Sequence, residues 1–202
     1  MTPTTTDAKS YLHHYLQDAR EALLWKLEGL SDYDVRRPLT PTGTNLLGLV
    51  KHLTGVEVGY LGFVFGRHFD EPVDWIGPDV APNVDMWANA EQSRDDIVGL
   101  YRRTWAHSDA TIEALGLDAV GHVMWWSEEQ SRATLQQVLV HVIAETHRHT
   151  GHADIVRELV DGRVGLREGD DNFMPSVDQE WWKEYRDQVE HVAQAAGRRV
   201  RQ

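Results

Sequence analysis

The chain of 202 residues is 41% hydrophobic, so it can bury one substantial core, and we expect a single domain over residues 1–202. With 32 acidic and 20 basic residues its formal net charge is -12, which repels phosphate backbones and anionic membrane surfaces, so we expect neither nucleic acid nor a membrane as a partner. The absence of cysteine excludes disulfides and thiolate ligands, so a metal site would use nitrogen and oxygen donors.

The N-terminal residues contain no basic region followed by an apolar core, and no run of about 18 apolar residues occurs in the chain, so we expect a cytoplasmic protein. Apolar residues recur at helical spacing in five segments, and no segment has a convincing strand pattern. This predicts an all-α bundle. The expected helices span residues 7–29, 45–66, 90–115, 134–161 and 177–196.

Turn and capping residues mark the ends of these helices. Gly29 is expected to end the first one. Side chains that can accept a hydrogen bond from a free backbone N–H precede the others. These are Thr44, the pair Asn89 and Gln92, the pair Thr134 and Gln137, and the pair Ser176 and Gln179.

Two long connectors separate the middle helices. The first, residues 66–87, is rich in proline, aspartate and aromatic residues and has no sustained period, so we expect it to pack on its own Trp75, Ile76, Met86 and Trp87. The second covers residues 116–132. Long connectors in a compact domain often shape a binding site.

The fourth expected helix carries a row of metal-competent side chains. On a helical projection, His141, Glu145, His149 and His152 fall within a sector of ~80°. Unpaired polar groups on an inward face are costly, and a bound cation would satisfy them. The apolar residues of the same sector, which indicate that it faces inward, are Val138, Val156 and Leu159.

Helical rise limits which of these residues share one ion. Glu145 and His149 are separated by ~6 Å of rise, whereas His141 and His149 are separated by ~12 Å. A third ligand must therefore come from another helix, and the second helix offers His52 and Glu57. Three protein ligands with one open position are typical of catalytic zinc sites.

Each of these residues also has a simpler interpretation. His141 alone is more often a hydrogen-bonded core residue, although the whole row together favours a metal. Glu57 alone fits a salt bridge to a buried arginine or a bond to a histidine. Arg157 is expected on the helix surface. The pairs Trp125–Trp126 and Trp181–Trp182 fit packing more readily than a pocket, and surface positions are expected for His13, His14, His68, His107, His122 and His191.

Two motifs carry a resemblance to a known family. LLGLVKHLTGVEVGYLG (residues 46–62) and LVHVIAETHRHTGHADIVRELVDG (residues 139–162) resemble the DinB-like metal-binding four-helix proteins. Within that group they are similar to the actinobacterial branch related to mycothiol-dependent S-transferases and maleylpyruvate isomerase. The likeness extends over nearly the full chain, including residues 29–48 and the tryptophan pair of the last helix.

The resemblance implies a four-helix bundle of up-down-down-up order, here with an additional C-terminal helix. It implies one divalent metal, commonly zinc, with nickel, manganese and iron as alternatives, held by His52, Glu145 and His149. Glu145 replaces the first histidine of the ligand pair, and the isomerase branch is similar in having a glutamate at this position. The carboxylate is a harder donor than the imidazole that it replaces. His152 and Glu57 become candidates for a second shell around the ligands, and His141 is expected in the core.

The resemblance also implies an activity: conjugation of a low-molecular-weight, mycothiol-like thiol to an electrophile. The metal-activated thiol is the expected nucleophile, so no protein side chain is assigned as catalytic. The alternatives are a thiol-dependent isomerase and a non-catalytic metal-binding protein induced by stress or damage. A homodimer is compatible with an exposed apolar helix face.

Overall fold

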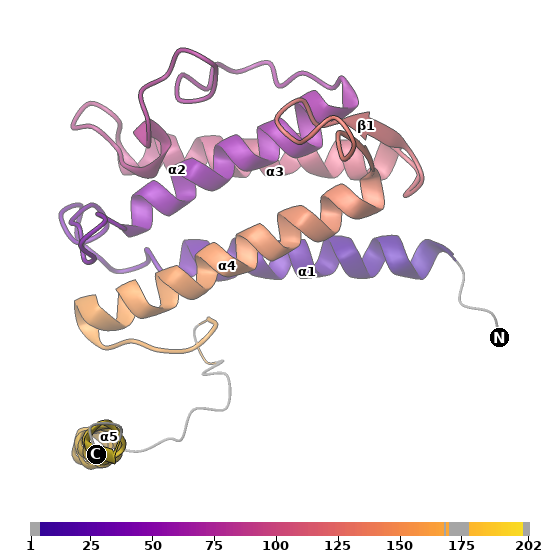
Figure 1. Ribbon diagram of the computed structural model, residues 1–202. Coiled ribbons are helices and arrows are strands. Elements are labelled where there is room, and N and C mark those ends of the chain that lie inside the picture. Colours follow the sequence, from indigo (N-terminus) through magenta and orange to yellow (C-terminus); the bar gives the residue numbers. More distant parts are fainter. Residues whose placement is uncertain (1–4, 168, 170–177, 200–202) are drawn as a thin grey trace.

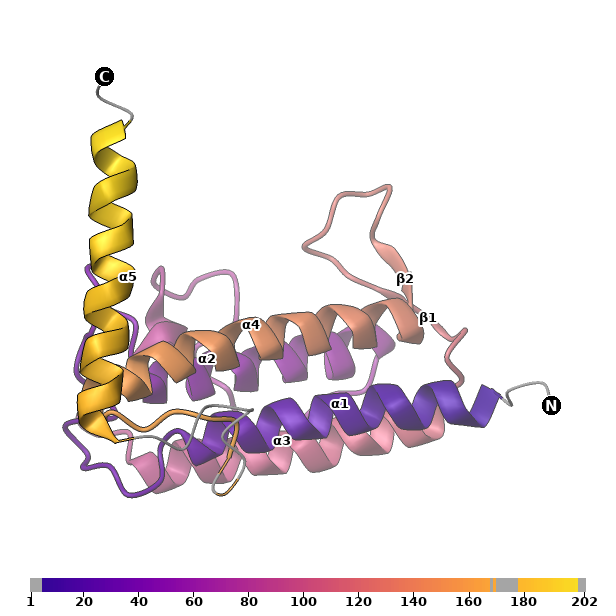
Figure 2. The same ribbon diagram turned by 90° about the horizontal axis from the view of Figure 1, so that it is seen from below.

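The computed structural model describes residues 5–167, 169 and 178–199, and four of its helices lie side by side in a bundle (Figure 1). A fifth helix, α5 (Gln179–Arg199), runs across the direction of the others (Figure 2). The all-α prediction is therefore confirmed. The bundle helices are α1 (Thr5–Trp25), α2 (Leu46–Glu57), α3 (Arg94–Ala114) and α4 (Leu135–Asp161).

The four bundle helices run in the expected up-down-down-up order. In Figure 1, α1 and α4 run in one direction while α2 and α3 run in the other. Helix α1 packs mainly against α4, and α2 packs against both α3 and α4. Because α2 and α3 are parallel, the chain must return along the bundle between them, which explains the long connector of residues 66–93. None of the described helices is long and apolar enough to cross a membrane.

Two clusters of buried apolar side chains form the core. One lies among all four bundle helices and includes Leu23, Leu49, Tyr101 and Val156. The other includes Leu61 and Leu139 and lies under the second connector. Their burial follows the helical spacing of the sequence, and it is the main source of stability in such a bundle.

The observed helix starts differ slightly from the expected ones. Asn45, one residue after the expected Thr44, caps α2 by accepting a hydrogen bond from the Gly48 amide at 2.8 Å. Ser93 caps α3, and the expected pair Asn89 and Gln92 forms a separate turn before it. The expected cap of α4 is confirmed. Thr134 accepts a bond from the Gln137 amide, whereas Ser176 lies outside the described residues.

Helix α2 continues beyond Glu57 with a changed hydrogen-bond pattern. A π-helical turn (Val58–Gly62) and a 3-10 turn (Phe63–Phe65) follow, and Gly66 ends the segment in the left-handed conformation. The expected helix 45–66 is thus present, but its last third is irregular. Such π turns are frequent at functional sites, and this one carries Tyr60 toward the second connector.

A short hairpin corrects the expectation that the chain has no strands. Strands β1 (Val120–His122) and β2 (Arg132–Thr134) pair antiparallel, with Gly121 opposite Ala133. Three residues are too few for an alternating pattern to stand out in the sequence. A Cβ on Gly121 would lie 2.5 Å from Val64 Cγ1, so the hairpin packs tightly against the end of the α2 segment.

Two residues of α4 lie on faces opposite to those expected. Arg157 was expected at the surface but is buried, where it binds Asp161 and donates to the carbonyls of Lys26 and Glu28. Leu159 was expected to face inward but is 60% exposed. The reason is that Arg157 satisfies backbone carbonyls after the end of α1, a demand that helical periodicity does not reveal.

A buried ion pair joins α1 to α2. Arg20 and Glu57 are both 0% exposed, and the guanidinium binds both carboxylate oxygens at 2.8 and 2.5 Å. Arg20 also donates to Asp109 on α3 at 2.7 Å. This confirms the salt-bridge interpretation of Glu57. Removing one partner alone would leave the other charge buried without compensation.

We predict that Arg20→Met lowers the free energy of unfolding by about 3–5 kcal/mol, because it leaves the Glu57 carboxylate buried and unpaired. The double variant Arg20→Met/Glu57→Met should lose clearly less than the sum of the two single variants, since it buries no lone charge. Urea denaturation measures both. Arg103→Met, which breaks an exposed pair with Glu71, serves as the control and should change stability little. Additive losses in the double variant would contradict this account.

Candidate metal centre

Three side chains from two packed helices converge between α2 and α4. His52 comes from α2, and Glu145 and His149 come from α4. One ligand atom from each lies within 4.8 Å of the other two. These are the three residues expected from the sequence to bind a metal, and tertiary structure brings them together across about ninety residues of chain.

The distances within the group fit a small cation. Glu145 Oε1 lies 2.9 Å from His149 Nε2 and 3.7 Å from His52 Nε2. The Glu145 and His149 side chains are one helical turn apart, so they point to the same place. Two imidazole nitrogens and one carboxylate oxygen suit zinc and other divalent first-row metals.

The orientation of His52 provides an independent sign of fit. Its Nδ1 donates to the Asp85 carboxylate at 2.6 Å, because a carboxylate can only accept. In the neutral imidazole the lone pair then lies on Nε2, and this atom is buried and has no hydrogen-bond partner. A buried acceptor without a partner is costly, and a metal at this point would satisfy it.

Asp85 is a functional candidate that the sequence did not single out. It lies in the 3-10 turn Val84–Met86 of the first connector. The buried Lys51 fixes this turn by donating to the carbonyls of Val84 and Trp87 at 2.7 and 2.8 Å. The general expectation that this connector shapes a site was the available signal. Nothing in the sequence distinguishes Asp85 from the other aspartates of the same segment.

A close approach between backbone segments places the turn against α2. A Cβ on Gly48 would lie 1.9 Å from the Met86 carbonyl oxygen, so only glycine fits there. Asn45 donates to the same oxygen at 3.1 Å. Gly48, Asn45 and Lys51 together position the turn so that Asp85 meets His52, one turn of helix beyond Gly48.

His149 is prepared to bind as a neutral imidazole. It is 5% exposed, and burial lowers its pKa, an effect to which the neighbouring His52 adds. The His149 Nδ1 atom lies 3.4 Å from His152 Nδ1. His152 therefore contacts His149 itself and not the point where the three ligand atoms meet. His152 therefore lies next to a candidate ligand, and its supporting role there stays a prediction.

Glu145 remains ionised beside these imidazoles. Burial raises the pKa of Glu145, but the hydrogen bond with His149 and the charges of nearby groups outweigh burial, so the pKa is lowered. An ionised carboxylate is the form that binds a cation.

Two other expected residues lie apart from the three ligands. Both carboxylate oxygens of Glu57 accept hydrogen bonds from Arg20, so Glu57 belongs to the buried ion pair and not to the ligand group. His141 is half-buried and was expected deeper in the core. Its ring lies 4.6 Å from that of Tyr60 and 5.2 Å from that of Trp126, centroid to centroid.

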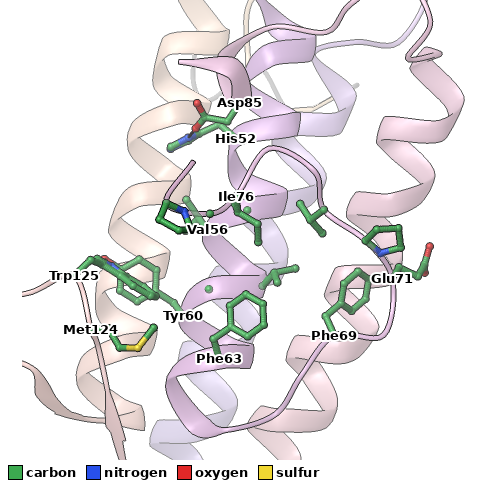
Figure 3. A pocket seen from close by; sticks show the side chains of 17 residues that line it. His52, Val56, Tyr60, Phe63, Phe69, Glu71, Ile76, Asp85, Met124 and Trp125 are labelled. Atoms are coloured by element: carbon green, nitrogen blue, oxygen red, sulfur yellow. Dashed lines mark hydrogen bonds and ion pairs between the residues drawn. The ribbon is translucent and has the colours of Figure 1, made fainter. Parts of the chain in front are cut away.

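An apolar cavity of about 820 Å³ opens beside His52. Figure 3 shows His52 and Asp85 at one end of it and Phe63 and Met124 at the other. Trp125 lines the cavity and donates to the Tyr60 hydroxyl at 2.8 Å, so for this tryptophan the pocket interpretation is right. Trp181 and Trp182 contact each other and Tyr185 on α5 instead.

Comparison with known proteins identifies the family. Residues 11–162 match the family model described as Mycothiol-S-transferase, a range that includes most of α1, all of α2, α3 and α4, and the three candidate ligands. The chain belongs to the mycothiol-S-transferase family. This family is DinB-like, in agreement with the resemblance seen in the two sequence motifs.

One solved structure supports the fold of this mycothiol-S-transferase family member. The crystal structure of a conserved protein from Enterococcus faecalis is similar with a TM-score of 0.59, at 16% sequence identity, over 76% of this chain and 97% of that one. At this identity the likeness shows the fold alone. No curated protein matches the chain.

We predict that His52→Ala and His149→Ala each abolish near-stoichiometric metal binding, because two remaining ligands hold a divalent ion poorly. Elemental analysis of the purified proteins measures this. His141→Ala, which removes a histidine of the same helix outside the ligand group, should retain its metal. If both ligand variants kept the metal, the centre would lie elsewhere.

We predict that Asp85→Asn weakens metal binding by about 10- to 100-fold. The neutral amide would hold the His52 ring less strongly than the carboxylate does, and it would not raise the basicity of the ring. Competition with a chromophoric chelator measures the affinity. Asp79→Asn is the matched control, since Asp79 is an exposed aspartate of the same connector. Equal affinities for the two variants would rule out the role assigned to Asp85.

Proposed function

We propose that the protein is a divalent-metal-dependent transferase that conjugates a low-molecular-weight thiol, mycothiol in the first instance, to an electrophile. The observation that carries this proposal is the position of His52. Its side chain belongs both to the candidate ligand group and to the lining of the apolar cavity. Family membership supports the same activity.

His52, Glu145 and His149 would hold the metal, with zinc favoured by the two imidazole donors. When bound, the metal would lower the pKa of a thiol so that the nucleophilic thiolate forms at neutral pH. Three protein ligands leave a position open for this purpose.

The chain's own residues would prepare the remaining parts of the reaction. Asp85 keeps His52 in one tautomer, and His152 supports His149 from the opposite ring nitrogen. The apolar wall around Tyr60 and Trp125 keeps water away from the electrophile. Exclusion of water protects the thiolate from solvation and the electrophile from hydrolysis.

The bond changes follow from the thiol's chemistry. The thiol loses its proton to solvent, and the sulfur forms a bond to an electrophilic carbon. With an activated halide the carbon–halogen bond breaks and the halide leaves with the electron pair. With an epoxide the carbon–oxygen bond breaks, and the oxygen takes the electron pair and then a proton. With an unsaturated ketone the α-carbon takes the proton after addition.

A thiol-dependent isomerase is the second candidate, supported by Glu145 in place of the first histidine of the ligand pair. A purely structural metal would also use these residues. However, structural zinc sites are usually closed by four protein ligands, whereas the three side chains here adjoin a cavity.

We predict that the zinc-loaded protein consumes mycothiol in the presence of an activated aryl halide, an epoxide or an unsaturated ketone. Glutathione and bacillithiol serve as comparison thiols. Loss of thiol is followed with a thiol-reactive dye, and the conjugate is identified by mass spectrometry. His149→Ala should reduce the rate to background, because the nucleophile is no longer activated, while His141→Ala should keep its metal-dependent rate.

Absence of thiol consumption with all three thiols and all three electrophile classes would remove the transferase from consideration. Isomerisation without net thiol loss would favour the second candidate.

A further inference from the structure

The side chains that line the cavity beside His52 indicate which class of electrophile it would bind. Its wall is formed by four aromatic side chains, together with aliphatic residues and the thioether of Met124. Aromatic and thioether groups bind flat apolar rings by stacking and edge contacts. The four aromatic residues are Tyr60, Phe63, Phe69 and Trp125.

The cavity has the volume of a site for a small organic molecule. Its roughly 820 Å³ falls within the usual range for such sites, about 300–1,000 Å³. Glycines in the α2 segment help to leave this space open. A Cβ on Gly59 would lie 3.3 Å from Trp125 Cη2, so any larger side chain at this position would project into the cavity wall.

The charged groups of the cavity are carboxylates. Asp85 and Glu71 belong to the lining, and within the described part of the chain the lining contains no lysine or arginine. The cationic partner of Glu71 is Arg103, which binds both carboxylate oxygens from α3, outside the lining. An anionic ligand would therefore find no lysine or arginine in the cavity lining to pair with.

Metal binding does not reverse this preference. The two positive charges of a bound divalent ion would be matched by the carboxylates of Glu145 and Asp85, which lie on either side of His52. A thiolate added to this site brings a further negative charge. A second anion in the cavity would then be repelled at short range in a largely apolar surrounding, where such repulsion is strong.

We propose that this cavity is the electrophile subsite and that it selects neutral aromatic electrophiles over their anionic counterparts. The electrophile part of this inference rests on the proposed transferase function. The binding preference itself needs neither thiol nor turnover, so it can be tested separately.

Two fluorescent probes of nearly the same shape test the preference. N-phenyl-1-naphthylamine is neutral, and 8-anilinonaphthalene-1-sulfonate carries the same ring system with a sulfonate. We predict that the zinc-loaded, full-length protein binds the neutral probe at least about tenfold more tightly. Fluorescence titration measures both affinities. Equal or tighter binding of the sulfonate would overturn the inference and leave the transferase proposal untouched.

Variants locate the neutral probe in the cavity. Gly59→Leu fills the wall next to Trp125 and should weaken binding by at least about tenfold. Gly151→Leu is the matched control, because Gly151 is also helical and has no atom within 4 Å of an added Cβ. If the two variants bound the probe equally, the site would not be this cavity.

A charge change tests the electrostatic part. Phe63 lines the cavity and is 41% exposed, so Phe63→Lys should fold and should shift the preference toward the sulfonate probe by about tenfold. Val140→Lys adds the same charge at an exposed position of α4 outside the lining and should leave the preference unchanged. An unchanged preference in Phe63→Lys would refute the assigned cause.

The protein could bind the neutral probe more tightly than the sulfonate and yet consume no thiol. This result would separate the binding proposal from the transferase proposal. The cavity would then bind neutral aromatic molecules, and the transferase assignment alone would fail.

Discussion

The close packing of the 66–93 connector against the glycine-containing face of α2 is the constraint on which the site depends. At Gly48 the Met86 carbonyl takes the space of a side chain, and at Gly59, in the π turn after α2, an added Cβ would lie 3.3 Å from the Trp125 ring of the second connector. These contacts bring segments from both connectors onto one helix. The first supplies Asp85 to His52, and together they build the wall of the cavity.

This arrangement links the polar and apolar halves of the site through α2. His52 faces α4, where Glu145 and His149 lie, and it also forms one end of the cavity. Beyond it the helix changes to a π turn, which carries Tyr60 to the second connector, where two indole N–H groups donate to its hydroxyl. A metal at His52 and an apolar substrate at Tyr60 would therefore be held by the same helical segment, about two turns apart.

Buried charges elsewhere in the bundle have a different role. Arg20 and Glu57 neutralise each other between α1 and α2, and Arg157 binds backbone carbonyls at the far end of α1. Both groups bridge α1 to another helix by specific polar contacts. Such contacts contribute less to net stability than apolar burial does, but a mismatched packing would leave them unpaired and costly.

The sequence by itself determined the fold class, the helical segments and the pairing of Glu145 with His149 on one helix face, because helical periodicity and rise are local properties. It left His52 and Glu57 as alternatives for the third ligand, and only the family resemblance favoured His52. The tertiary structure places His52 beside the pair and Glu57 against Arg20. Tertiary structure alone decided that Asp85 orients His52, that Arg157 is buried and that Trp125 lines a cavity. Each of these depends on which segments, distant in sequence, lie against one another. The short hairpin at residues 120–134 belongs with them, since three-residue strands are defined by their partner rather than by their own pattern.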